Sequence, residues 1–373
     1  MGSLAWQLRG RRSGFDRILL YFTVIAALMG LVAVYSATLS YGSLTSIIVQ
    51  SGACAVGVLA MLALSRFDYE QFNLLIMPIF AVSIFLLVLV LIIGTGADEV
   101  GAKSWIRFGP VGIQPAEIAK VGFIITFGYH LSKKEKTVNK VSTLIGLFVH
   151  LAVFLALIML QPDAGSAMVF AFIFIVLLFA AGLSLKLIIP AIVVGAASLP
   201  FIYKFGLSPY QQHRIQAFLN PELDPLGKGY NVIQSKIAVG SGGLFGKGYL
   251  NGTQNQMGFL PAKHTDFIFS TISEEFGFIG GIIVVAVLMV IISRCFMVAI
   301  RSQNKFGRYI AAGVGAMLLF HTLENVGMCI GLMPVTGIPL PLFSYGGTSM
   351  LTNLIAIGLV LSVSRRNKGS FYL

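Results

Sequence analysis

Apolar runs of about the length that spans a bilayer recur along this chain, and short polar stretches separate them. A helix needs about 20 apolar residues to cross the hydrocarbon core. The pattern therefore predicts an all-α polytopic membrane protein with ten transmembrane helices, at approximately residues 18–38, 44–64, 74–94, 115–132, 142–160, 163–182, 187–205, 266–293, 309–331 and 346–364.

Two of the polar interruptions are longer than a simple connection needs. One covers about residues 95–114, and the other runs from about 206 to 265, between the seventh and eighth predicted helices. Within the second, YNVIQSKIAVG places apolar residues at helical spacing beside polar ones, which predicts a short helix at the membrane interface. Alternation of the spans places this large loop outside the cell, so we expect the chemistry to face outward.

Composition agrees with the pattern of runs. Hydrophobic residues make up 57% of the 373 residues and charged residues 11%, whereas a soluble globular domain has an apolar share of roughly 45–50%. No shift of composition divides the chain, so we expect one integral membrane domain over residues 1–373.

The formal net charge of +12 first suggests nucleic acid, but the basic residues stand in short clusters between apolar runs. Such clusters are typical of the cytoplasmic loops of membrane proteins. Most fall inside when the N-terminus is cytoplasmic, which predicts that both termini are cytoplasmic and that the partners include membrane lipids but no nucleic acid. The three cysteines, Cys54, Cys295 and Cys329, stand singly in apolar segments and predict neither a disulfide nor a metal framework.

Two segments, GIQPAE and LQPDAG, resemble helix starts, because each follows proline with an acid near the positive end of the helix dipole. Capping explains Asp163 as well as a role in a site does. Glu117 has Lys120 one turn further along the helix, where the two can pair. A buried pair is costly unless its charges are satisfied, so we interpret Glu117 and Lys120 as a pair that shapes a site, with a plain helix start as the alternative.

The stretch FLPAKHTDFIFSTISEEFGFIG at 259–280 brings His264, Asp266 and a Glu-Glu pair to the opening of a predicted span. A carboxylate at the centre of a membrane helix costs roughly 2.5–3.5 kcal/mol, so such acids are rare without a function. The alternative for Asp266 is that it caps the helix that follows, a task that Thr265 could share.

Two further segments contain candidate chemistry. GSGGLFGKG at 240–248 lacks the Ser or Thr that a nucleotide-binding loop has at its end; it is either a flexible turn or a set of backbone N–H groups that contacts a lipid pyrophosphate beside Lys247. TGIPLPLFSYGGTSM at 336–350 indicates broken backbone, which is tolerated at membrane depth where it lines a cavity. His321 and Glu324 in the preceding span are either packing residues or part of that site.

The order of motifs resembles a known family. WIRFGP, IQPAEIAK, LQPDAGSA, HRIQAFLNPELDP, GSGGLFGKG, LPAKHTDFIFSTISEEFG and GLMPVTGIPLPLFSYGGTSM follow one another as in the SEDS proteins of shape, elongation, division and sporulation. The sequences of these motifs are closer to those of the elongation branch than to those of the division branch, and the resemblance covers nearly the whole chain. It implies a ten-helix fold in a bacterial plasma membrane and a peptidoglycan glycosyltransferase that polymerises lipid II into glycan strands on the outer face.

The resemblance also implies roles and a partner. Asp266 takes the place of the family's essential acid in HTDF, Glu117 and Lys120 take the place of its paired charges, and a class B penicillin-binding protein is the expected partner. Around them we expect Asp163, His264 and Glu324 to shape the site.

This chemistry needs a base for the acceptor hydroxyl and positive charge for the departing diphosphate. Asp266 can be the base if burial or a neighbouring acid lifts its pKa above about 3.9. A divalent cation, Mg²⁺ or Mn²⁺, is an alternative or an addition to basic side chains. The candidate substrate-binding or diphosphate-binding residues are Lys103, Arg107, Arg214, Gln234, Lys236, Lys263 and Ser344.

Two other functions fit the same sequence. Ten helices with buried ionisable groups also suit a lipid II flippase, although no pair of broken helices occupies matching halves of the chain. The chain could instead be a scaffold that recruits and activates a transpeptidase.

Overall fold

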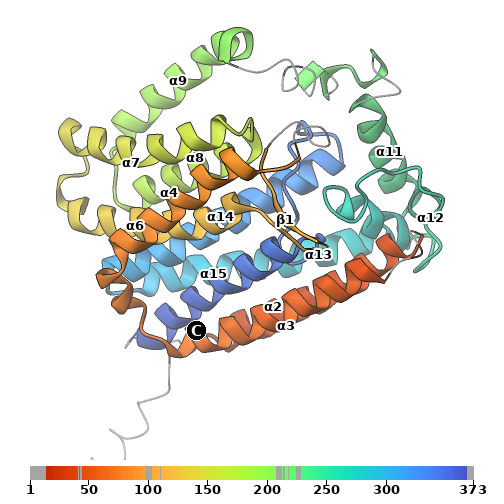
Figure 1. Ribbon diagram of the computed structural model, residues 1–373, viewed down its shortest axis with the longest axis horizontal. Helices are drawn as coiled ribbons and strands as arrows, with labels where there is room; N and C mark the ends of the chain where they lie inside the picture. The colour runs from red at the N-terminus through yellow and green to blue at the C-terminus, as the bar shows by residue number, and fades with distance from the viewer. Residues whose placement is uncertain are drawn as a thin grey trace, which may run out of the picture.

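The computed structural model describes residues 14–40, 42, 44–96, 103–109, 111–206, 212, 215, 216, 218–223 and 228–367 (Figure 1). Within these residues, seven helices are long and apolar enough to cross a membrane. They are α2 (Arg17–Leu39), α3 (Thr45–Arg66), α4 (Ile76–Ile93), α7 (Val141–Met159), α13 (Ile268–Arg301), α14 (Lys305–Cys329) and α15 (Gly347–Arg366).

Shorter or more polar elements complete the described fold. α8 and α9 have 17 residues each, and α6 has 20 residues but includes two buried charges. The remaining elements are α6 (Pro115–Lys134), α8 (Ala164–Ala180), α9 (Leu185–Phe201), α11 (Lys228–Ser241), α12 (Thr253–Gln256), the short helices η1 (Tyr69–Leu74), η2 (Glu135–Thr137), η3 (Ile202–Gly206) and η4 (Pro221–Leu223), and the strands β1 (Ile106–Phe108) and β2 (Val111–Ile113).

Each predicted span coincides with one of these helices to within a few residues, except that α13 extends eight residues further, to Arg301. The predicted short helix in the second long loop is also present, as α11. One element was not expected from the sequence: β1 and β2 pair antiparallel, with Ile106 opposite Ile113. Gly109 has a φ of +59° in the turn between them, a conformation that glycine adopts without steric cost.

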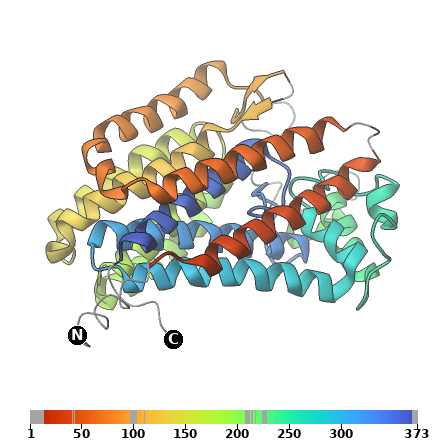
Figure 2. The same ribbon diagram turned by 90° about the horizontal axis from the view of Figure 1, so that it is seen from below.

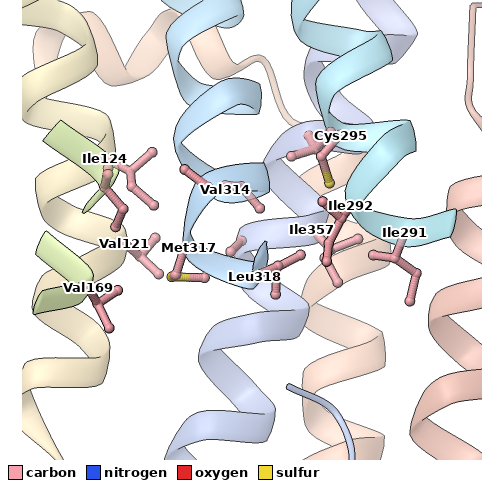
Figure 3. Close-up of a cluster of buried hydrophobic side chains, with 14 of the residues drawn as sticks. Val121, Ile124, Val169, Ile291, Ile292, Cys295, Val314, Met317, Leu318 and Ile357 are labelled. Atoms are coloured by element: carbon pink, nitrogen blue, oxygen red, sulfur yellow. The ribbon is translucent and has the colours of Figure 1, made fainter. Parts of the chain in front are cut away.

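α14 and α15 form the interior of the helix bundle. Of their spanning residues, 78% and 83% are buried, against 17–39% in the other five apolar helices. In Figure 3, Val314, Met317 and Leu318 of α14 lie between side chains of α6 and side chains of α13. The outer helices therefore present apolar faces to lipid, while α14 is surrounded by protein and can hold polar side chains.

The helix α13 is broken at Gly277, where φ is +70° and ψ −166°. The GSGGLFGKG segment repairs this break. Lys247 N donates to the carbonyl of Glu274 over 3.0 Å and Gly248 N to that of Glu275 over 3.0 Å, while Phe278 N and Ile279 N donate to the carbonyls of residues 243 and 244 over 2.8 and 3.2 Å. Backbone groups left unpaired in a membrane cost several kcal/mol, so the glycine-rich segment substitutes for the missing helical turn.

Side chains fasten the same segment. The buried carboxylate of Glu274 accepts Lys247 Nζ at 2.8 Å and the backbone N–H groups of Gln254 and Asn255 at 2.8 and 3.0 Å. Glu274, the first acid of the Glu-Glu pair, therefore holds a loop. The N–H groups of Lys247 and Gly248 already donate to carbonyls at the helix break. They are therefore not available for the phosphate contact that was one of the two interpretations of residues 240–248.

The bundle has two distinct ends. Figure 2 shows the start of α2 and the end of α15 at one end, with α11 and α12, drawn in teal, at the other. Asp16 N donates to Ser364 Oγ over 2.9 Å, which confirms that the first and last helices meet there. Asp266, at the start of α13, lies at the opposite end.

Candidate functional site

Asp266 lies in a tight turn immediately before α13. Thr265 N and Phe267 N both donate to the carbonyl of Ala262, over 3.1 and 3.2 Å, and the side chain of Asp266 is half-buried. The N-cap position of α13 is Phe267. Asp266 therefore stands one residue ahead of the capping position, which weakens the capping alternative.

Asn325 of α14 holds this turn in place. Its Nδ2 donates to the backbone carbonyl of Asp266 over 2.8 Å and to that of Ile338 over 2.8 Å, and Asn325 is fully buried. One amide group thus joins the Asp266 turn to the non-helical segment between α14 and α15. A buried carbonyl without a partner is costly, so both segments depend on this side chain.

That non-helical segment, residues 331–346, contributes two more bonds to the turn. Ser344 Oγ donates to the carbonyl of Thr265 over 2.6 Å, and Tyr345 N donates to the carbonyl of His264 over 2.7 Å. Gly337 faces the Asp266 carboxylate: a Cβ built at Gly337 would lie 3.7 Å from Oδ2. The carboxylate therefore lies against broken backbone of the kind that the sequence predicted for this segment.

Gln50 of α3 fixes the far end of the segment. Its Nε2 donates to the carbonyl of Ser344 over 3.0 Å, and its Oε1 accepts Gly346 N at 3.0 Å, with the side chain fully buried. Gly30 of α2 allows close approach from the other side, because a Cβ there would lie 2.0 Å from the carbonyl oxygen of Leu342. The segment is thus positioned by α2, α3 and α14 together.

Glu117 and Lys120 form the predicted pair. Lys120 Nζ lies 2.7 Å from Glu117 Oε1, both residues are buried, and α6 begins at Pro115 as predicted. Lys120 Nζ also lies 3.0 Å from Nε2 of His321 on α14. Because an ammonium can only donate, Nε2 is the acceptor and the ring proton is on Nδ1. Glu117, Lys120 and His321 therefore form one polar contact between α6 and α14.

Glu324 and Asp163 both have local partners. Thr336 Oγ1 donates to Glu324 Oε1 over 2.8 Å, which joins α14 to the 331–346 segment. Asp163 is the N-cap of α8: its Oδ1 accepts Ser166 N at 2.9 Å and its Oδ2 accepts Ser166 Oγ at 2.8 Å. Pro162 precedes the cap, so LQPDAG does not repeat the helix start of GIQPAE, and the capping interpretation accounts for Asp163.

His264 and Lys263 lie two and three residues before Asp266 in the chain; His264 is half-buried and Lys263 fully buried. Burial, and then the charge of Lys263, lowers the pKa of His264 to about 4, so the ring is neutral at pH 7 and packs on Tyr345 with centroids 5.3 Å apart. Lys263 is fully buried and donates to Ser40 Oγ over 2.5 Å and to the carbonyl of Asn255. Burial lowers its pKa, against the opposing charges of Glu275 and Glu274.

The remaining candidates for substrate contact are spread over several elements. Lys236 on α11 is exposed, and its side chain lies across Gly331, since a Cβ there would be 1.8 Å from Lys236 Cε. Gln234 is half-buried on the same helix. Lys103 is exposed before the β hairpin, and Arg107 is exposed within it. Arg214 lies outside the described residues.

Two site residues, Asn325 and Gln50, were missed in the sequence. Both are amides within otherwise apolar helices, and a polar side chain in such a position is a signal of function or of satisfied packing. α14 presents His321, Glu324 and Asn325 at spacings of three and four, so they lie on one face of the helix. That face links α6, the 331–346 segment and the Asp266 turn, and the arrangement can hold a carboxylate proton acceptor rigidly at one end of the bundle.

Together these features define a class: a multi-pass helical membrane protein with a carboxylate-centred polar site at one end. The chain belongs to the FTSW_RODA_SPOVE family, described as cell cycle protein, which matches residues 16–369.

Curated relatives are at least 35% identical to it over nearly the whole of both chains. The probable peptidoglycan glycosyltransferase FtsW of Geobacter metallireducens is 38% identical over 364 residues, covering 95% of this chain and 96% of that protein. The peptidoglycan glycosyltransferase MrdB of Escherichia coli is 36% identical over 362 residues, covering 96% and 97%. The peptidoglycan glycosyltransferase RodA of Treponema pallidum is 35% identical over 430 aligned positions, covering 95% and 98%.

Solved structures share the fold. A chain from a structure described as the structural coordination of polymerization and crosslinking by a peptidoglycan synthase complex matches with a TM-score of 0.81 at 32% identity, covering 95% of this chain and 98% of that one. The crystal structure of the rod shape determining protein RodA of Thermus thermophilus matches with a TM-score of 0.70 at 28% identity, covering 95% and 98%.

Proposed function

We propose that this protein is a peptidoglycan glycosyltransferase that polymerises lipid II into glycan strands, with Asp266 as the general base. Family membership and the names of the relatives support the activity. The observation that carries the role of Asp266 is its setting: Asn325, Ser344 and Tyr345 hold the turn by backbone contacts, and Asp266 does not occupy the N-cap position.

The reaction is a single displacement. The Asp266 carboxylate accepts the proton of the acceptor sugar's hydroxyl, the resulting oxygen attacks the anomeric carbon of the donor, and the bond to the lipid diphosphate breaks with its electron pair. Attack opposite the leaving group converts an α-linked donor to a β-linked product. Holding the reacting groups in position lowers much of the barrier in such reactions. The rigid turn would hold the Asp266 carboxylate in this way.

The leaving diphosphate needs positive charge. Lys236 is the best placed of the cations named from the sequence, because it lies against Gly331, where the 331–346 segment begins. Lys103 and Arg107 are exposed at the hairpin, which α15 approaches through Thr348 Oγ1 donating to the carbonyl of Gly112 over 2.9 Å. Lys263 and Ser344 stay predictions, and both already donate to protein oxygens.

A divalent cation also stays a proposal. In the part of the chain that the structure describes, no group of three His, Cys, Asp or Glu side chains converges as a protein-held metal site requires. Mg²⁺ is commonly bound by one or two carboxylates together with substrate phosphates. A cation would here be held chiefly by the diphosphate itself.

For the topology, we infer that α6, α8 and α9 cross the bilayer with the seven apolar helices, giving ten spans and a large outer loop at about 206–265. Lys134 is the last residue of α6, and Asn251 lies between α11 and α12; both are exposed. Figure 2 shows the end of α6 and the α11–α12 region at opposite ends of the bundle. The native cysteines are all buried, so an introduced thiol can be labelled selectively. An impermeant maleimide applied from outside should label Asn251→Cys but not Lys134→Cys; the reverse pattern would sink a topology with cytoplasmic termini.

We propose a class B penicillin-binding protein as the partner and cell elongation in a bacterial plasma membrane as the setting. The similar chain from a peptidoglycan synthase complex supports a partnership of polymerase and crosslinking enzyme. Relatives named FtsW and RodA are nearly equally identical to this chain, so overall identity does not separate division from elongation. The sequences of the motifs support the elongation role. Co-purification with a single-span transpeptidase is the expected result; full activity in cells that lack every such partner would count against it.

One assay separates the polymerase from a flippase and a scaffold. Purified protein with its partner should convert radiolabelled lipid II into glycan polymer, whereas a flippase would only move it between leaflets and a scaffold would leave it unchanged. Asp266→Asn removes the base but keeps size and shape. We expect this variant to insert, to bind its partner and to make no polymer; near wild-type polymerisation would falsify the catalytic assignment.

A further inference from the structure

A basic cavity lies at the end of the bundle opposite Asp266. Arg17 is the first residue of α2, Arg66 the last of α3, and Arg365 lies in the last turn of α15. Their side chains border one cavity of about 330 Å³. Its other lining residues are Phe15, Leu20, Leu62 and Ser65.

The three helix ends are fastened without using these guanidinium groups. Asp16 N donates to Ser364 Oγ over 2.9 Å, and Arg366 Nη2 donates to the carbonyl of Arg66 over 3.0 Å. α3 and α15 also pack closely, since Gly358 would place a Cβ 2.9 Å from the Cα of Met61. The cavity is therefore a fixed feature of the helix packing, and its arginines remain available to a ligand.

Acids close to the cavity in sequence are matched elsewhere. Asp16 Oδ2 binds Arg294 at 2.7 and 2.8 Å, and Asp68 Oδ1 binds Arg366 at 3.0 Å. Within the described ranges, no ion pair joins Arg17, Arg66 or Arg365 to an acid. Like charges around one cavity repel each other, so an anion bound among them gains attraction from all three.

A bias of arginine toward cytoplasmic helix ends orients membrane proteins in general. That bias explains the number of basic residues, but not why three from separate helices border one cavity with an apolar wall. Guanidinium groups match the oxygens of a phosphate in paired geometry. Leu20, Leu62 and Phe15 provide the apolar wall that a glycerol backbone and its first methylenes would need.

We propose that this cavity binds the headgroup phosphate of an anionic glycerophospholipid, phosphatidylglycerol or cardiolipin, from the leaflet on the side of the chain termini. The cavity lies at the helix ends, where headgroups are found, and basic pockets between helices at that level suit anionic lipids. On α3, Arg66 borders this cavity, whereas Gln50, 16 residues earlier, binds the carbonyl of Ser344 beside the Asp266 turn; at 1.5 Å per residue the two positions are about 24 Å apart along the helix. The inference stands apart from the polymerase function.

The test measures lipid binding to the purified full-length protein by native mass spectrometry. The probes are phosphatidylglycerol, cardiolipin and phosphatidylcholine of matched chains, with glycerol 3-phosphate as the soluble source of the same phosphate. The variant is Arg17→Gln/Arg66→Gln/Arg365→Gln. Its control, Lys134→Gln/Lys136→Gln/Lys140→Gln, removes three exposed cations from the same end of the bundle.

We expect the wild type to retain the two anionic lipids and to discriminate against phosphatidylcholine. Affinity should fall about fivefold for each arginine replaced and on the order of a hundredfold in the triple variant, with the control within about twofold of the wild type by the same reasoning. If the triple variant does not fold, Arg66→Gln and Arg66→Lys are compared singly; Arg66→Gln should lose about fivefold in affinity, and Arg66→Lys less, because lysine keeps the charge but not the paired geometry.

Three results would overturn the proposal. Equal binding of phosphatidylcholine would make the contact one of acyl chains only. Unchanged lipid binding in the arginine variants would place the lipid elsewhere on the protein. Binding of glycerol 3-phosphate that matches or displaces the lipids would assign the cavity to a soluble phosphate compound.

Discussion

Asn325 donates its side-chain amide to the backbone carbonyl of Asp266 over 2.8 Å, from a position where it is fully buried. The second bond of the same amide, to Ile338, fixes the backbone that faces the carboxylate. Together with the bonds from Ser344 and Tyr345, this side chain, which has no acid–base chemistry of its own, sets the distance between the Asp266 turn and the segment opposite it. Displacement of about 1 Å in such a geometry can cost a hundredfold in rate.

Replacing Asn325 should therefore lower activity more than stability alone explains. Asn325→Leu keeps the side-chain volume but leaves the carbonyl of Ile338 without this donor and that of Asp266 with only the weaker Cys329 Sγ donor at 3.7 Å, at a cost of about 1–3 kcal/mol. We expect lipid II polymerisation by the folded protein to fall at least tenfold. Initial rates normalised to monodisperse protein, together with melting temperatures, measure the two effects.

The control is Asn139→Leu, since Asn139 also bonds the backbone, accepting Ser184 N at 2.8 Å far from Asp266. It should lose stability without losing specific activity. Equal specific activities of the two variants would remove Asn325 from the positioning of Asp266.

The helices could be predicted because each apolar run has the length of a bilayer, and the environment on both sides of a membrane helix is simple. The break at Gly277 could not be predicted in the same way, because the apolar run continues through it and the groups that repair it lie about thirty residues earlier. Glycine in a helix is compatible with an unbroken helix, so the sequence alone did not distinguish the two.

Among the ionisable residues of the candidate site, the sequence predicted one contact. Glu117 and Lys120 stand one turn apart, which predicts their contact, but nothing in the sequence places His321 against Lys120 across 201 residues. The roles of Gln50 and Asn325 were hidden for the same reason, since an amide does not reveal which carbonyl it binds. Burial was hidden too: Lys263 was expected to face a diphosphate and is fully enclosed.

The contact between Glu117 and Lys120 predicts coupled effects of substitution. Removing one partner leaves an uncompensated buried charge, which costs about 3–5 kcal/mol, whereas removing both leaves none. We expect Glu117→Gln and Lys120→Met each to be more destabilised and less active than the double variant, as a double-mutant cycle of melting temperature and polymerisation would measure. Harmless single changes would reduce the pair to a helix-start feature.

The glycine-rich segment predicts that alanine at Gly246 and alanine at Gly240 have opposite effects on stability. Gly246 has a φ of +80°, and a Cβ there would lie 2.1 Å from the carbonyl oxygen of Glu275, whereas a Cβ at Gly240 in α11 meets nothing within 4 Å. Gly246→Ala should destabilise the protein by at least about 2 kcal/mol, because it combines a left-handed backbone with a clash at the helix break.

Gly240→Ala should be neutral or stabilise by up to about 1 kcal/mol, because alanine favours the helix. Thermal unfolding in one detergent compares the two variants directly. A Gly246→Ala protein as stable as Gly240→Ala would show that the loop does not support the break in α13.

His264 predicts a specific dependence of stability on pH. Burial lowers its pKa from 6.5 to about 4 in the folded protein, so between these values the unfolded chain binds a proton that the folded chain does not. Stability is unaffected above about pH 6.5 and falls as the pH falls toward 4, by on the order of 2 kcal/mol between pH 7 and pH 5. His264→Gln cannot take up this proton, so its melting temperature should drop less over that interval. The comparison is a difference between two proteins that share every other titrating group, which isolates His264, and parallel pH curves for the two would mean that the ring accepts a proton as readily in the fold as outside it.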